Sequence, residues 1–274
     1  MFVIKLKLFY IIDIKVKMEV SIMRKKLLLL SLLTGLVFSF SMKTVRVEAI
    51  ASENSPEVQV RSIIGSDERV RIFDTTESPY NSIAFIAADG AAGSGAVIGK
   101  NTVLTAAHVV KNIRNNPNKE SIYVIPGRNG TNLPYGKFKI ESVHIPQRYI
   151  ENPSVDSDIA VITVGTLNGK SIGELVPILP YKLTNTVETG MDLITTGYPG
   201  DKTWGTMWSS NGTVQGQTNT RIYYNMDTAG GQSGSPVYNL NKEIVGVHTT
   251  GAGSKNFATK LNNEYYQFVS KNIS

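Results

Sequence analysis

Short apolar runs, separated at close intervals by turn-forming residues, constrain the fold of this chain more than any other feature. From Ser82 onward the runs lie at residues 83–88, 95–98, 103–104, 122–125, 138–144, 159–164, 192–196, 221–226 and 243–248. Glycine, proline, asparagine and aspartate separate them, at residues 88–90, 126–127, 129–130, 199–200 and 211–212. Many short strands with turns about every 8–12 residues indicate an all-β sandwich or barrel.

Residues 262–272 show a different period. Tyr265, Phe268 and Val269 recur at spacings of three and four, which places them on one face of a helix. We therefore expect a C-terminal helix whose apolar face packs onto the barrel.

The composition allows a large core and excludes cysteine chemistry. The chain has 274 residues, of which 41% are hydrophobic, enough for one large domain or two small ones that share a cleft. It contains no cysteine, so it has no disulfide framework, zinc-thiolate site or cysteine nucleophile. We also find no acidic cluster with the spacing of a calcium loop, and we expect neither a metal nor a cofactor.

Charge is unevenly distributed along the chain. Residues 1–61 hold 10 of the 28 basic and 5 of the 22 acidic residues, which leaves 18 and 17, a net charge of +1, in residues 62–274. The basic excess therefore lies at the N-terminal end, and we see no Lys/Arg stripe in the remainder that would indicate a nucleic-acid partner.

The N-terminal region resembles a secretory leader. A basic start at residues 23–26 is followed by an apolar run at residues 27–40, which is typical of a signal peptide. The run is shorter than the roughly 20 residues that span a bilayer, so an uncleaved anchor is the lesser alternative. We expect secretion without stable membrane association, a leader at residues 1–49 cut near 49–51, and a propeptide or plain linker at 50–61. Met1, Met18 and Met23 all stay open as the start.

The most specific motif lies at residues 228–236, where Ser233 stands among glycines. A nucleophilic serine needs its Oγ exposed on a tight turn and backbone N–H groups directed at the developing oxyanion. Flanking glycines permit positive φ angles and close approach of the substrate. We expect the N–H groups of Gly231 and Ser233 to form this oxyanion hole.

Two weaker motifs precede it. His108 follows small residues, and Asp158 directly precedes the apolar run at residues 159–164; Asp156 is a nearby rival. Each motif alone is more often structural, but the order His, Asp, Ser is that of the chymotrypsin template and differs from the orders of subtilisin and the α/β-hydrolases. Together with the all-β pattern, this order predicts two six-stranded antiparallel β-barrels of the chymotrypsin type. His108 would act as general base, Asp158 would orient it, and Ser233 would be the nucleophile.

The two other histidines have different expected roles. His144 lies between apolar residues and is interpreted as structural. His248 lies 15 residues after Ser233, on the strand that lines the specificity pocket of a two-barrel protease. A histidine at that position is a candidate hydrogen-bond donor to an acidic side chain of the substrate.

These residues resemble the bacterial glutamyl endopeptidases. The matching segments follow in order at residues 62–69, 74–76, 105–110, 157–161, 197–202, 207–208, 228–236 and 245–248. The resemblance implies hydrolysis after Glu, less readily after Asp, and places the family's pocket residues at His248 and Thr228. Thr249 and Thr250 depart from the bulkier, Gly-rich segment of relatives, so the extended subsites are expected to differ.

The resemblance also implies activation by processing. It places the mature N-terminus at Ser62, whose free α-amine would help to bind the substrate carboxylate. The chain would then be a zymogen that an activating protease cuts near Arg61. We expect an N-terminal barrel at residues 62–168 and a C-terminal barrel with the terminal helix at 169–274, acting as a monomer on peptides with Glu before the scissile bond.

Two alternatives remain beside this reading. One is a protease of the same fold with the narrow specificity of the exfoliative toxins. The other is a catalytically silent binding protein on this fold, which the presence of all three triad residues disfavours.

Overall fold

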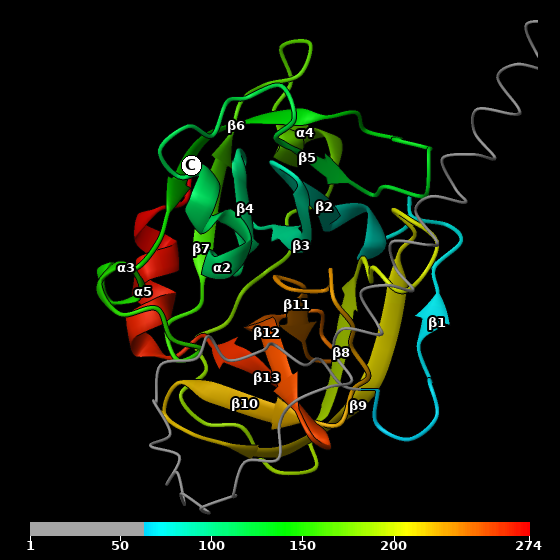
Figure 1. Cartoon of the computed structure of the whole chain (residues 1–274), viewed down its shortest axis with the longest axis vertical. Coiled ribbons are helices and arrows are strands. Elements are labelled where there is room, and N and C mark those ends of the chain that lie inside the picture. The colour runs from blue at the N-terminus through cyan, green and yellow to red at the C-terminus, as the bar shows by residue number, and fades with distance from the viewer. Residues whose placement is uncertain (1–62) are drawn as a thin grey trace, which may run out of the picture. The chain divides into compact units, whose positions relative to one another are not determined.

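The computed structural model describes residues 63–274, and the expectations about the leader, the propeptide and Ser62 lie outside these residues. The first barrel is closed in the order β2-β3-β4-β7-β6-β5, and every strand pair is antiparallel (Figure 1). Its strands are β2 (Ile83–Ala88), β3 (Ala91–Val97), β4 (Thr102–Thr105), β5 (Tyr123–Pro126), β6 (Phe138–His144) and β7 (Ala160–Val164).

The second barrel has the order β9-β10-β13-β12-β11-β8, and a further pairing between β8 and β9 closes it. Its strands are β8 (Asp192–Gly197), β9 (Trp208–Gln217), β10 (Arg221–Tyr224), β11 (Pro236–Tyr238), β12 (Ile244–Ala252) and β13 (Lys255–Lys260). A short N-terminal strand, β1 (Val70–Arg71), joins this sheet through β9. The expectation of two six-stranded antiparallel barrels is confirmed.

Helical segments are short except at the C-terminus. They are η1 (Tyr80–Ser82), α2 (Ala107–Val110), η2 (Lys111–Ile113), α3 (Gln147–Glu151), α4 (Ile172–Leu175) and α5 (Asn263–Lys271). The Asn262 side chain accepts a hydrogen bond from the Tyr265 N–H at 3.0 Å and caps α5, because the first turn of a helix has unsatisfied N–H groups. The helix expected at residues 262–272 is confirmed, with Tyr265 and Val269 as its buried residues.

The N-terminal end of the described chain packs on the second barrel, and the C-terminal end packs on the first. The strand β1 pairs with the second barrel, whereas α5 returns to the first (Figure 1). The Tyr265 hydroxyl donates to the carbonyl oxygen of Asp156 at 2.7 Å, and the Asn101 N–H donates to the Ser274 carbonyl oxygen at 2.9 Å. These contacts tie the two barrels together from both termini.

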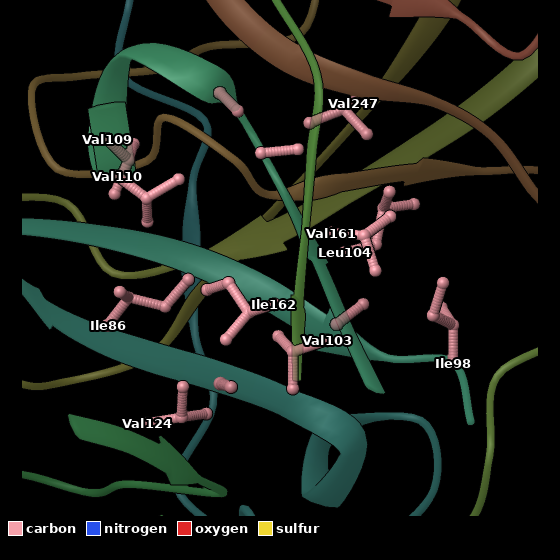
Figure 2. Packing of buried hydrophobic residues seen from close by; sticks show 14 of the residues in the cluster. Ile86, Ile98, Val103, Leu104, Val109, Val110, Val124, Val161, Ile162 and Val247 are labelled. Carbon is pink, nitrogen blue, oxygen red and sulfur yellow. The ribbon is translucent and has the colours of Figure 1, made fainter. Parts of the chain in front are cut away.

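Branched aliphatic side chains fill the first barrel. Ile86, Val103, Val124 and Ile162 are fully buried and meet from β2, β4, β5 and β7 (Figure 2). Burial of one such side chain contributes about 1.5–3 kcal/mol, and β-branched residues suit the pleated surface of a strand. This core holds the strands that carry the site.

One expected turn is wrong. Asn211 and Gly212 lie inside β9, paired with Ile194 and Leu193, rather than between strands. A Cβ on Gly212 would lie 2.6 Å from Asn225 Oδ1, so this glycine serves the close approach of a neighbouring segment. The expected turn at residues 88–90 does form, where Asp89 and Gly90 have φ values of +47° and +91° as in a hairpin turn.

Candidate active site

His108 lies in α2, directly after β4 of the first barrel, and faces Asp158. Its Nδ1 is 2.6 Å from Asp158 Oδ2, and its backbone N–H donates to Asp158 Oδ1 at 2.8 Å. Asp158 is only 1% exposed. A buried carboxylate is costly unless it is hydrogen-bonded, and here the side chain and the backbone of one residue engage both oxygens. The position of the imidazole is therefore well determined.

The loop that carries Asp158 is held by the second barrel. Thr259 of β13 donates to the Asp158 carbonyl oxygen at 3.1 Å. Asp156 binds the second barrel instead, where its Oδ1 accepts hydrogen bonds from Arg221 Nε and Thr220 Oγ1, both at 2.7 Å. The Arg221 hydrogen bond lowers the pKa of the Asp156 carboxyl below its ordinary value, although partial burial opposes this. The structure thus places Asp158, rather than Asp156, beside the histidine.

Ser233, in the second barrel, contacts the other ring nitrogen of His108. Its Oγ lies 2.6 Å from His108 Nε2. The loop around it is tight: the Gln232 N–H donates to the Ala229 carbonyl oxygen at 3.1 Å, and the Ser235 N–H donates to the Gln232 carbonyl oxygen at 2.9 Å. A hydroxyl that contacts a carboxylate-bound imidazole has the geometry of an activated nucleophile.

The glycines beside Ser233 are required by conformation and by space. Gly231 and Gly234 have φ values of +93° and +85°. A Cβ on Gly231 would lie 2.5 Å from the Tyr198 carbonyl oxygen, and one on Gly234 would collide with the Ser94 carbonyl oxygen. Only glycine tolerates both constraints, as expected from the sequence.

Two candidate pocket residues are buried in the second barrel. His248 lies on β12 and Thr228 lies at the start of the nucleophile loop; both are fully buried. Within residues 63–274, Thr228 Oγ1 has no hydrogen-bond partner. Buried hydroxyls in native proteins are nearly always hydrogen-bonded, so this one is suited to a ligand.

Tyr224 is a candidate site residue that sequence reasoning missed. Its hydroxyl lies 2.6 Å from His248 Nδ1, and burial raises its pKa well above the ordinary value, so the phenol stays protonated. The alternation of buried Ile222 and Tyr224 along β10 indicates an inward-facing side chain, but nothing in the sequence indicates its partner.

His144 has a different setting. It lies in β6, and its Nε2 is 3.1 Å from the hydroxyl of Ser142 on the same strand.

Over residues 63–274 no helix is both long and apolar enough to cross a bilayer, and no group of three or more His, Asp or Glu residues gathers as a metal site would require.

Comparisons with known proteins agree with this geometry. The family of trypsin-like peptidase domains matches residues 93–247. The glutamyl endopeptidase of Bacillus licheniformis is 34% identical over 218 residues, 76% of this chain and 67% of the relative. That of Staphylococcus epidermidis is 34% identical over 219 residues, 77% of this chain and 74% of the relative.

A solved structure of a Glu endopeptidase superimposes with a TM-score of 0.69 at 30% identity, and covers 77% of this chain and 98% of that protein. Fold, family model and relatives thus point to one class of enzyme. The chain belongs to the bacterial glutamyl endopeptidase family of trypsin-like serine endopeptidases.

Proposed function

We propose that this protein is a secreted endopeptidase that cleaves peptide bonds after glutamate, with Ser233, His108 and Asp158 as its catalytic triad. The observation that carries the mechanism is the line of two 2.6 Å contacts through His108, from Asp158 Oδ2 to Ser233 Oγ. Glutamyl endopeptidases among the relatives support the choice of substrate.

In the proposed mechanism, Ser233 Oγ attacks the scissile carbonyl while His108 Nε2 takes its proton. The imidazolium is stabilised by Asp158 and returns the proton to the leaving amine. The N–H groups of Gly231 and Ser233 donate to the oxyanion as charge develops. Water then attacks the carbonyl carbon of the acyl-enzyme while His108 Nε2 takes a proton from it. The imidazolium returns this proton to Ser233 Oγ, and the product acid is released.

Glutamate selectivity is assigned to Thr228, His248 and Tyr224. If the protonated Tyr224 hydroxyl donates to His248 Nδ1, the neutral imidazole carries its proton on Nε2, where it can donate to a carboxylate. The Thr228 hydroxyl supplies a second donor. A substrate without the acid leaves the buried Thr228 hydroxyl unpaired, and an unpaired buried donor is a strong way for a site to reject an analogue.

The end of β12 offers a place for the substrate backbone. Among the described strands, residues 250–252 pair with β13 alone, since β11 pairs only with residues 244–247. An extended peptide can therefore add to this edge as a further strand. The Ser233 Oγ lies 3.5 Å from the Thr249 carbonyl oxygen, so this edge begins next to the nucleophile.

Secretion and activation complete the proposal. A leader at residues 1–49 would direct export, and removal of residues 50–61 would free the α-amine of Ser62 to join the donors of the pocket. Sequencing the N-terminus of the active secreted form tests both, and a start other than Ser62 would contradict the assignment.

The principal test compares two peptides that differ only in Glu or Gln before the scissile bond. The processed enzyme should cleave the Glu peptide at least tenfold more efficiently.

The Ser233→Ala variant should lose roughly 10⁴–10⁶-fold in kcat, because nucleophile and base act as one unit. Full activity in that variant would overturn the mechanism, while equal cleavage of both peptides would overturn the specificity. A fluorophosphonate probe that fails to label Ser233 would favour a silent binding protein.

A further inference from the structure

A buried carboxylate attaches the N-terminal segment, residues 64–69, to the wall of the proposed pocket. Asp227 directly precedes Thr228 and is 3% exposed. Its Oδ1 accepts a hydrogen bond from the Ile64 N–H at 2.6 Å, and its Oδ2 accepts one from the Glu68 N–H at 2.8 Å. Both oxygens of this carboxylate are thus engaged by a segment far away in sequence.

The same segment has a second attachment, through Arg69 to Asp201. The Arg69 guanidinium is fully buried and donates to both carboxylate oxygens of Asp201, at 3.0 and 2.5 Å. Asp201 follows Gly200, whose N–H donates to the Gly230 carbonyl oxygen at 2.5 Å. Arg69 Nη1 also lies 3.4 Å from Gln232 Oε1. The N-terminal segment therefore contacts Asp227, directly before the loop that carries Ser233, and Gln232, directly before Ser233 itself.

The proposed chemistry does not itself require a charge at Asp227. A buried carboxylate is unfavourable unless hydrogen-bond donors satisfy it, and the donors here are two backbone N–H groups of the N-terminal segment. The backbone of residue 227 is held separately, since its N–H donates to Ser210 Oγ at 2.9 Å. Undocking of the segment would leave a buried charge without these donors, next to Thr228, and residues 227–228 would have to move to reach water.

We propose that Asp227 is a positioning residue of the acid-binding pocket, which holds Thr228 in place only while residues 64–68 are docked on it. This rests on the proposed glutamate specificity.

The first variant is Asp227→Asn in the processed enzyme, which keeps the size of the side chain but replaces one acceptor oxygen by a donor. KM for the Glu peptide should rise at least fivefold, kcat should stay within twofold, and the preference for Glu over Gln should fall. Fluorophosphonate labelling of Ser233 should keep its rate, because the triad is untouched. Asp192→Asn, at the exposed first residue of β8, is the matched control and should change none of these.

The second variant removes the donor instead of the acceptor. Ile64→Pro deletes the N–H that reaches Asp227 Oδ1 and leaves the pocket residues unchanged. It should reproduce the rise in KM, and the double variant should be no worse than the more affected single one, because both changes break one contact. Additive losses would overturn the proposal, as would an unchanged KM in either variant. Loss of labelling in Asp227→Asn while Ile64→Pro behaves as wild type would make Asp227 a structural residue only.

Hydrogen exchange separates this proposal from the glutamate assignment. The Ile64 and Glu68 amides should exchange at least tenfold faster in Asp227→Asn than in wild type. Unchanged exchange would overturn the docking even if the enzyme selects Glu. Conversely, a wild type that cleaves Glu and Gln peptides equally, with faster exchange in the variant, would overturn the specificity and the pocket role of Asp227 while retaining the docking.

Discussion

The two barrels bury different kinds of side chain. The first is filled with aliphatic residues such as Ile86 and Ile162, whereas the second also buries His248, Asp227 and Lys260. The Lys260 ammonium, for example, donates to three oxygens at 2.7–2.8 Å instead of facing solvent. Buried polar groups are tolerated only with partners, so the second barrel depends on these hydrogen bonds as well as on packing.

This difference matches a division of labour between the barrels. The first barrel carries His108 and Asp158 of the proposed triad, which would need a rigid frame and no contact with the side chains of the substrate. The second carries Ser233 and the proposed pocket, where buried donors would recognise a charged side chain. Changes in the first barrel should therefore affect the chemical step or stability, and changes at the pocket residues of the second barrel, apart from Ser233, should affect selectivity.

Among the comparisons between the two barrels, the largest expected effect is at Asp158, the acid of the proposed triad. Asp158→Asn should lower kcat about 10⁴-fold, because the amide favours the wrong tautomer of His108. Asp156→Asn, on the same loop but paired with Arg221, should change kcat less than threefold. Steady-state kinetics on the Glu peptide measures both, and equal losses would show that the loop is needed only as a whole.

The aliphatic core of the first barrel should show the next largest effect. Ile162→Ala deletes a fully buried side chain of β7 and should lower the free energy of unfolding by about 2–5 kcal/mol. Ile178→Ala, at a residue that is 48% exposed, should change it by less than about 0.5 kcal/mol. Denaturant unfolding measures both. The ratio of Glu to Gln cleavage should stay as in wild type. A changed ratio would contradict the expectation that the first barrel does not affect selectivity.

In the second barrel the effect should fall on selectivity. His248→Ala should lower kcat/KM for the Glu peptide at least tenfold, and Tyr224→Phe should do so less strongly because the imidazole remains. His144→Ala is the matched histidine control, since His144 contacts Ser142 outside the pocket. A Glu preference that survives His248→Ala would contradict the pocket assignment.

The smallest expected effect concerns the ion pair that joins the barrels. The pKa of Asp156 is lowered below its ordinary 3.8, mainly by the Arg221 hydrogen bond. The carboxylate therefore stabilises the fold above pH 3.8, and this contribution is lost as the pH falls through the lowered pKa. Asp156→Asn should cost about 1 kcal/mol near neutral pH, as partly exposed pairs do, and nothing at low pH. A difference that persists in acid, or in an Arg221→Ala background, would contradict an electrostatic origin.

Much of the fold follows from local patterns in the sequence. The runs at residues 83–88 and 138–144 coincide with β2 and β6, since alternating or continuous apolar residues suit strands in a closed barrel. The strands β1, β9, β11 and β13 were not predicted. The strand β11 has three residues and β13 begins and ends with lysine, so pairing with neighbouring strands, and not local pattern, defines them.

The sequence by itself determined that the chain lacks cysteine, that it forms all-β barrels, and that three motifs stand in the order His, Asp, Ser. Only the tertiary structure decided that Asp158 and not Asp156 faces His108, that Tyr224 contacts His248, and that the N-terminal segment docks on Asp227. His108 is separated from Asp158 by 50 residues and from Ser233 by 125. The physical reason is that such contacts depend on how strands close into barrels and how the barrels meet, which local residue preferences do not encode.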